Sequence, residues 1–150
     1  MRTDVSGWVT RLTDRDIVRY AHSGAWRNVT LADCALRAAE HAPERVAVVE
    51  GSRSLTFGRI LAESRQLAAA FTAMGLQPGE TISYQLPNWA ETMTINLAAC
   101  LAGLVVNPIV PIYREADVRY ILRDCRSRVF FIPEVFRNFE QPYLSRNITQ

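Results

Sequence analysis

Apolar residues along this chain recur in two alternating patterns, short unbroken runs and stripes at helical spacing. Between residues 84 and 111 the pattern predicts the end of a strand, then a helix, then a second strand closed by two prolines. Over residues 58–74, apolar or small side chains recur three or four positions apart, which predicts a helix with one face toward a core. The members of this stripe are Ile60, Ser64, Leu67, Phe71 and Met74.

The two kinds of element alternate along most of the chain. Helices are expected over 14–22, 31–41, 58–74, 89–102 and 114–125. Strands are expected over 45–50, 54–57, 81–86, 104–107 and 128–133, with 81–86, 104–107 and 128–132 as the core of one sheet. Apolar strands that alternate with helices predict an α/β fold, with βαβ units and a mainly parallel sheet.

Capping residues mark the predicted helix starts. Thr13 and Thr30 are each followed three residues later by an aspartate, a pairing typical of a capping box. Asn88, followed by Glu91, predicts a similar cap for the helix over 89–102. Apolar side chains lie nearly all round that helix, so we expect it to pack on both sides.

The charge pattern places the middle of the chain inside the fold. Residues 66–113 contain no basic residue and only two acidic ones, Glu80 and Glu91, so the arginine-bearing flanks should cover them. The formal net charge of +2 is too small to draw the chain toward nucleic acid or a membrane surface. The chain has no lysine, which excludes Schiff-base chemistry and lysine-dependent phosphate binding for this chain alone.

The cysteines and histidines do not have the spacing of a metal site or a disulfide framework. Cys34, Cys100 and Cys125 are far apart, and each lies in an apolar helical context, which predicts three buried core thiols. His22 and His41 lie near predicted helix ends and are expected at the surface.

The N-terminal residues lack the apolar run of a signal peptide, which predicts a cytoplasmic protein. The uncharged stretch 92–113 is long enough to span a bilayer. It contains Asn96 and Asn107 and ends in prolines, however, so a buried helix leading to a buried strand explains it better. No transmembrane segment is therefore expected.

Residue types that carry chemistry are sparse. The seven glycines are scattered, whereas a phosphate-binding loop needs clustered glycines; Gly75 and Gly103 are instead expected to end two helices. Five arginines lie between residues 114 and 128 and could bind an anion. Because acidic residues are interleaved with them, a solvated helix face is favoured. Residues 134–150 show no period and are interpreted as an unpatterned tail or truncated linker behind a first unit over 1–133.

A series of short motifs follows in order from residue 55 to residue 115. It comprises Leu55-Thr56-Phe57, Gly75-Leu76, Pro78-Gly79, Pro87-Asn88 with Glu91, residues 98–103, Asn107-Pro108 and Pro111. With this series the chain, from about residue 16 to residue 139, resembles the N-terminal part of AMP-forming acyl-CoA synthetases, members of the adenylate-forming superfamily. The sequence of residues 111–115 resembles the corresponding segment of medium- or short-chain fatty acid and cyclohexanecarboxylate CoA ligases.

The resemblance implies a partial N-terminal subdomain of the large domain of such a synthetase. The complete enzymes use Mg-ATP to form an acyl-adenylate and pyrophosphate, and then transfer the acyl group to CoA. Their Ser/Thr/Gly-rich loop, adenine motif, ribose-binding aspartate, hinge and catalytic lysine have no counterpart in these residues. We therefore expect no catalytic, cofactor-binding or metal-binding residue here. The matched positions are structural ones in the family: Pro87, Asn88, Glu91, Gly103, Pro108 and Pro111.

Three functions stay open. The favoured one is the N-terminal part of an ATP-dependent fatty or alicyclic acid–CoA ligase, inactive alone and completed by a missing C-terminal part or a separate chain. The second is a non-catalytic relic or interaction module that pairs with a full-length synthetase through an open sheet edge. The third is a small-molecule-binding α/β domain that uses the carboxyl ends of its strands, near Pro87, Pro108 and Pro133. Without the rest of the large domain, we expect the helix over 89–102 to be under-covered.

Overall fold

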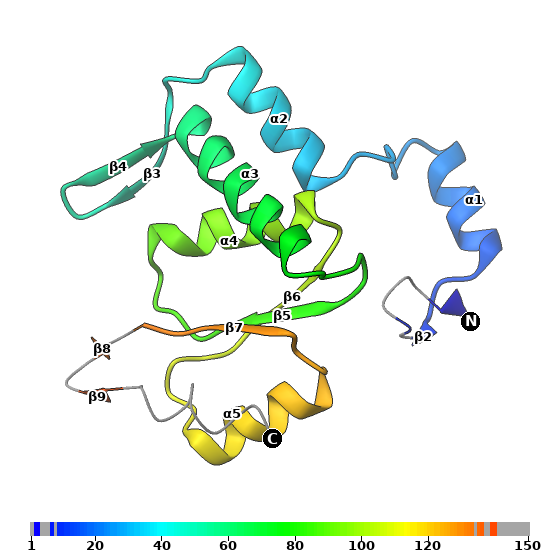
Figure 1. Ribbon diagram of the computed structural model, residues 1–150. Coiled ribbons are helices and arrows are strands. Elements are labelled where there is room, and N and C mark those ends of the chain that lie inside the picture. Colours follow the sequence, from blue (N-terminus) through cyan, green and yellow to red (C-terminus); the bar gives the residue numbers. More distant parts are fainter. Residues whose placement is uncertain (1, 4–6, 8, 134, 137–138, 141–150) are drawn as a thin grey trace.

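The computed structural model describes residues 2–3, 7, 9–133, 135–136 and 139–140 (Figure 1). The helices are α1 (Asp14–His22), α2 (Leu31–His41), α3 (Phe57–Ala73), α4 (Ala90–Leu101) and α5 (Glu115–Asp124). The strands are β1 (Arg2–Thr3), β2 (Val9–Thr10), β3 (Val46–Glu50), β4 (Arg53–Thr56), β5 (Thr81–Tyr84), β6 (Val105–Pro108), β7 (Val129–Phe131), β8 (Val135–Phe136) and β9 (Phe139–Glu140). Each predicted helix and strand up to residue 133 is present, with bounds that differ by one to two residues at most ends.

The predicted parallel sheet is confirmed and has the order β6-β5-β7. Both neighbours of β5 run parallel to it, and Ile82 at its centre lies opposite Val106 on one side and Val129 on the other. Each of the two crossovers contains a helix, α4 between β5 and β6 and α5 between β6 and β7. The result is the βαβ arrangement that the alternation of patterns predicted.

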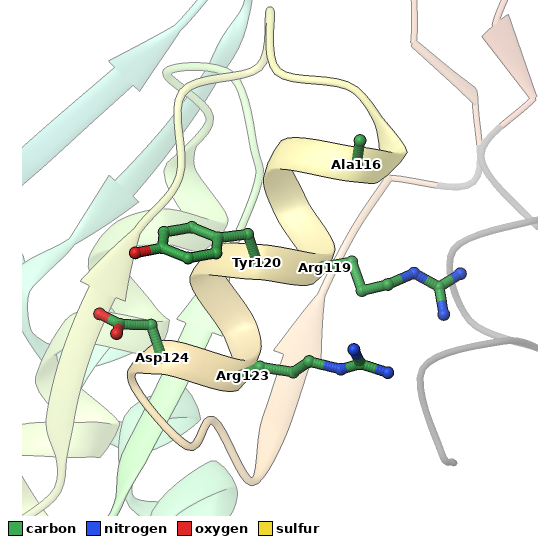
Figure 2. Close-up of a pocket in the computed structure, with 5 residues that line it drawn as sticks. All are labelled: Ala116, Arg119, Tyr120, Arg123 and Asp124. Atoms are coloured by element: carbon green, nitrogen blue, oxygen red, sulfur yellow. The ribbon is translucent and has the colours of Figure 1, made fainter.

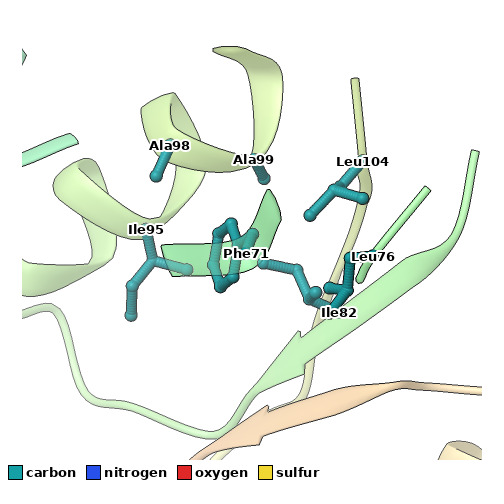
Figure 3. Close-up of a cluster of buried hydrophobic side chains, with 7 residues drawn as sticks. All are labelled: Phe71, Leu76, Ile82, Ile95, Ala98, Ala99 and Leu104. Carbon is teal, nitrogen blue, oxygen red and sulfur yellow. The ribbon is translucent and has the colours of Figure 1, made fainter. Parts of the chain in front are cut away.

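Helices cover both faces of this sheet: α3 and α4 lie on one side, with α2 beyond them, and α5 lies on the other (Figure 1). Figure 3 shows the core between α4 and the sheet, where the side chains of Ile95, Phe71 and Ile82 share one apolar space. Phe71 is 1% exposed and meets Phe131 edge to face, with ring centroids 6.1 Å apart. This geometry is favoured for aromatic pairs.

The packing of α4 on two sides is confirmed, and of the under-covering expected for this helix the structure shows the exposure of Met93, which is 49% exposed. Ala98 and Ala99 face the sheet core, and Leu97 belongs to a second cluster that α2, α3 and β4 build on the opposite side. Ser64 links α3 to α4: its side chain is fully buried and donates a hydrogen bond to the Thr94 carbonyl at 3.1 Å. The helices α2 and α3, the hairpin strand β4 and the parallel sheet thus cover most of α4.

Two glycines end helices as expected. Gly75 follows α3 with φ +81°, and Gly103 follows α4 with φ +69°, both in the left-handed region that favours glycine. At Gly103 a side chain would also be crowded, because an added Cβ would lie 3.2 Å from the Cβ of Pro78. One member of the predicted α3 stripe is misplaced: Met74 lies at the C-cap, and 60% of its surface is exposed.

Away from the parallel sheet, β3 and β4 form an antiparallel hairpin, as the sequence predicted. None of the residues of α1 is buried, although the predicted capping box between Thr13 and Asp16 is fully formed. In the region expected to be an unpatterned tail, β8 and β9 pair with each other, and residues 134, 137–138 and 141–150 lie outside the described residues. Among the helices that the structure describes, none is long and apolar enough to cross a membrane.

Candidate functional site at the carboxyl edge of the sheet

The carboxyl ends of β5 and β7 and the first turn of α4 meet at one edge of the sheet. The chain leaves β5 through Gln85 and Leu86, turns at Pro87 and enters α4 at Ala90. The backbone N–H of Gln85 donates to the Phe131 carbonyl at 2.8 Å, which extends the pairing of β5 with β7 beyond the last strand residue. In open α/β sheets this edge is where ligands bind.

Residues on either side of the β3–β4 hairpin turn contact the first turn of α4 at this edge. A carboxylate oxygen of Glu50, at the end of β3, accepts a hydrogen bond from the Ala90 backbone N–H at 2.8 Å. On the other side of the hairpin turn, Arg53 forms an ion pair with Glu91. The hydrogen bond from Arg53 holds the pKa of the Glu91 carboxyl below its usual range, so this side chain stays charged at neutral pH.

The capping box predicted between Asn88 and Glu91 is wrong. The N-cap residue of α4 is Trp89, which makes no side-chain capping hydrogen bond, and Asn88 is exposed. The helix begins one residue later than an Asn88 cap requires, and Glu91, in its first turn, pairs with Arg53. Glu50, from another element, supplies the acceptor that a local cap would have supplied.

A hollow of about 450 Å³ lies between the hairpin, the start of α4 and the end of β7. Its volume falls in the range of small-ligand pockets, about 300–1,000 Å³. The lining is apolar except for three charged side chains of the hairpin and α4, which we call the rim. The apolar lining residues are Leu86, Trp89, Ile95, Phe131, Ile132 and Pro133, and the charged ones are Glu50, Arg53 and Glu91.

On the opposite side of the same edge, Gln85 ties β5 to the loop that follows β6. Its side chain is 1% exposed, and Nε2 donates to the carbonyls of Val110 and Tyr113, each at 3.0 Å. These two acceptors fix which end of the amide is the nitrogen, since Oε1 could not donate to them. Among the described residues Oε1 has no hydrogen-bond partner.

A small polar network lies under α5, on the same face of β5 as Gln85. Asn107 Nδ2 lies 3.0 Å from Ser83 Oγ and 3.4 Å from Cys125 Sγ. The prediction of three buried thiols is wrong, because Cys34 is exposed and Cys125 is half-buried. Cys100 is also half-buried, and burial raises the pKa of its thiol.

The arginines of α5 lie on its outer face, as the sequence predicted. In Figure 2, Arg119 and Arg123 extend from successive turns to one side of the helix, whereas Tyr120 and Asp124 extend to the other. Arg119 pairs with Glu115 at 2.7 Å, and Tyr120 is 70% exposed. Exposed ion pairs of this kind contribute little free energy, so the outer face of α5 is a charged helix surface.

The residues at the carboxyl edge offer binding groups but no activated nucleophile. No group of three His, Cys, Asp or Glu side chains within the described part of the chain could hold a metal ion. What the edge can do chemically is enclose an apolar group beside charged side chains.

Comparison with known proteins identifies the family of this chain. The model of the AMP-binding enzyme family matches residues 35–149, which is more than half of the chain. The chain belongs to the AMP-binding enzyme family. The match begins within α2 and extends through residues 134–149, which the sequence pattern predicts to be an unpatterned tail.

The relatives of this AMP-binding family chain include acyl- and aryl-CoA ligases. It is 34% identical over 119 residues to a medium-chain fatty-acid–CoA ligase of Escherichia coli K12, an alignment that covers 79% of this chain and 21% of that protein. It is 30% identical over 132 residues to a salicylyl-CoA synthase / salicylate adenylyltransferase of a Streptomyces species, covering 88% of this chain and 24% of the relative. The chain thus spans between a fifth and a quarter of the length of these relatives.

Solved structures agree on the fold of this AMP-binding family segment. The apo structure of Mycobacterium smegmatis MbtA matches with a TM-score of 0.73 at 24% identity, over 81% of this chain and 23% of that one. The anthranilate CoA ligase AuaEII in complex with anthranoyl-AMP matches with a TM-score of 0.66 at 25% identity, over 70% of this chain and 21% of that one. The expected α/β fold of a partial adenylate-forming domain is thereby confirmed.

Most of the family-motif positions gather at the carboxyl edge. Pro87 and Asn88 lie between β5 and α4, Glu91 lies in the first turn of α4, and Pro108 ends β6, with Pro111 in the loop beyond it. The sixth position, Gly103, lies at the other end of α4, next to Pro78. The structural role assigned to these six positions in the family stays a prediction for this chain.

Sequence reasoning missed Glu50, Arg53 and Gln85. The two hairpin residues act on a helix about forty positions away, and no local pattern signals such a contact. For Gln85 a signal was present, since Thr81, Ser83 and Gln85 alternate with apolar residues and so define one polar face of the strand.

Proposed function

We propose that this chain is the N-terminal part of an ATP-dependent carboxylic acid–CoA ligase that works through an acyl-adenylate. The observation that carries the proposal is the family match over residues 35–149, joined to relatives that are themselves CoA ligases or synthases. Because the chain spans only 21–24% of those relatives, the activity is assigned to a larger assembly that contains this segment.

In this proposal the segment supplies scaffold and no reacting group. The complete enzyme needs Mg-ATP to convert the carboxylate into an acyl phosphate anhydride with a good leaving group, and CoA to accept the acyl group. The chain has no lysine to stabilise charge on phosphate, and its glycines are dispersed. Its own contribution is the β6-β5-β7 sheet and the helix α4, packed on two sides, on which the remaining parts of the large domain would be built.

The proposed substrate is an apolar carboxylic acid, either a fatty or an alicyclic one, and the proposed place of action is the cytoplasm. Two observations support this class of substrate. The sequence of residues 111–115 resembles that of fatty acid and cyclohexanecarboxylate CoA ligases, and one relative is a medium-chain fatty-acid–CoA ligase. The missing C-terminal part, in the same polypeptide or in a separate chain, is the first proposed partner.

A second candidate function rests on the open edges of the sheet. Within the described residues, β6 and β7 each pair only with β5, so both outer edges present unpaired backbone groups. Such edges accept an added strand from another chain. A non-catalytic module could pair in this way with a full-length synthetase.

Carboxylate-dependent ATP–pyrophosphate exchange tests the proposal. The purified 150-residue chain is compared with the whole polypeptide that its source makes from the same reading frame, with octanoate, cyclohexanecarboxylate and salicylate as substrates. We expect exchange with octanoate or cyclohexanecarboxylate from the longer polypeptide and none from the chain alone. Exchange by the chain alone, above a heat-treated control, would contradict the proposal. If the native polypeptide ends at Gln150, addition of a full-length homologue decides between the first and second candidates.

A further inference from the structure

The hollow at the carboxyl edge has a floor and a rim of different chemistry. Six apolar or aromatic side chains form the floor, and Trp89, half-buried, lies at the start of α4 among them. An apolar group of a few carbon atoms would remove water from this floor and gain free energy in proportion to the area covered. The floor alone would accept any such group, so the rim decides which class binds.

The rim carries a net negative charge. Glu50 and Glu91 face a single arginine, Arg53, whose guanidinium is paired with Glu91. The hydrogen bond and charge of Glu91 raise the pKa of Arg53, and the charges of Glu50 and Glu63 add smaller contributions. Glu63 itself pairs with Arg59 at 2.8 Å.

The N-terminus of α4, which could otherwise bind an anion at this edge, already holds the carboxylate of Glu50. A helix N-terminus at the carboxyl end of a parallel strand offers backbone N–H groups and the positive end of the helix dipole to an anion. In this chain the carboxylate of Glu50 accepts from the Ala90 N–H at 2.8 Å. A carboxylate ligand would therefore have to displace Glu50 and approach Glu91, whereas a cation meets both carboxylates favourably.

We propose that the hollow lined by Trp89, Phe131 and the Glu50–Arg53–Glu91 rim binds a small apolar amine. The ammonium group lies at the rim between Glu50 and Glu91, and the alkyl or aryl part covers Trp89, Ile95 and Phe131. Binding is non-covalent and needs neither ATP nor CoA.

The fluorescence of Trp89 can be used to measure binding in the hollow. In the variant with Trp8→Phe and Trp26→Phe it is the one remaining tryptophan, and its fluorescence reports on the hollow. The 150-residue chain is titrated with hexylamine, hexan-1-ol and hexanoate, three probes with the same chain length and charges of +1, 0 and −1. Circular dichroism verifies that the variant is folded. We expect a saturable change with hexylamine, a weaker response to hexan-1-ol and the weakest to hexanoate.

Variants that remove a charge distinguish the contribution of the rim to binding from that of the apolar floor. Glu91→Gln removes one rim carboxylate and should weaken hexylamine binding about fivefold, the size expected for one exposed charge at about 4 Å in water. Glu115→Gln is the matched control, since Glu115 pairs with Arg119 on α5 and does not line the hollow. The control should bind hexylamine like the parent variant.

Three results would overturn the inference: no saturable response to hexylamine in the folded chain, hexanoate binding as tightly as hexylamine, or equal effects of Glu91→Gln and Glu115→Gln. None of these results bears on the proposed ligase, because pyrophosphate exchange by the longer polypeptide is measured with acids and without amines. A failure of the exchange assay likewise leaves the titration unaffected.

Discussion

On one face of the parallel sheet β5 presents Ile82 and Tyr84 to α3 and α4, and on the other it presents Ser83 and Gln85 to α5. We call these the α4 face and the α5 face. The α4 face holds seven buried residues around Phe71, whereas the α5 face holds three, together with the Ser83–Asn107–Cys125 network. The comparison teaches that a central parallel strand in which apolar and polar residues alternate can divide its two faces between a mainly apolar core and a more hydrogen-bonded one.

The difference predicts unequal stability. Burial of apolar surface is the dominant favourable contribution to folding, while a hydrogen bond replaces one made with water and contributes less. We therefore expect the α4 face to control global unfolding and α5 to open locally at a smaller free energy.

The largest effect is expected from Phe71→Ala. The ring is 1% exposed and contacts Phe131 edge to face, so its removal leaves a cavity on the α4 face. The free energy of unfolding should fall by about 3–5 kcal/mol, measured by urea denaturation followed by circular dichroism. Met74→Ala, at an exposed position beside the same helix, is the control and should change stability by about 0.5 kcal/mol or less. Equal losses in the two variants would contradict the assignment of the core.

A smaller effect is expected from Val118→Ala on the α5 face. Val118 is fully buried against Ile109 and Leu122, and the loss of two methyl groups should cost about 2 kcal/mol. Hydrogen exchange should accelerate at the amides of α5 and stay unchanged at those of α4. Tyr120→Ala, on the exposed side of α5, is the matched variant and should leave both unchanged. Equal acceleration in α4 and α5 would show that the two faces unfold together.

The elements of both faces could be predicted from the sequence, because they depend on signals within a few residues. Thr13 and Thr30 cap their own helices, and Gly103 ends its own. The carboxyl edge could not be predicted in this way. There, Glu50 caps a helix that begins forty residues later, so the nearest polar residue, Asn88, was the wrong choice. The burial of Cys34 was overpredicted for a related reason: the apolar character of its neighbours does not fix the side of α2 on which it lies.

The third prediction concerns Gln85, which supplies the polar link of the α5 face. In Gln85→Met a side chain of similar length keeps the packing, but the carbonyls of Val110 and Tyr113 lose their donor. The loss of Oε1, which has no partner among the described residues, offsets part of this cost. We expect a net destabilisation of about 1–2 kcal/mol in urea denaturation, with faster exchange of the Tyr113 and Arg114 amides. Gln66→Met, at an exposed position of α3, should be neutral, and an equal effect there would refute the link.

The smallest effect is expected where the hairpin meets the rim of the α4 face, from Arg53→Gln. Arg53 lowers the pKa of Glu91, so the ion pair stabilises the folded state above the pKa that Glu91 has in the unfolded chain, about 4.3. This contribution is lost as the pH falls through the lower folded pKa. The unfolding midpoint of the variant should therefore lie slightly below that of the parent at pH 7, and the two should converge below about pH 4. Arg65→Gln, at an exposed arginine of α3, is the control and should follow the parent at every pH. A difference that persists unchanged into acid would mean that Arg53 holds the hairpin by packing and not by its charge.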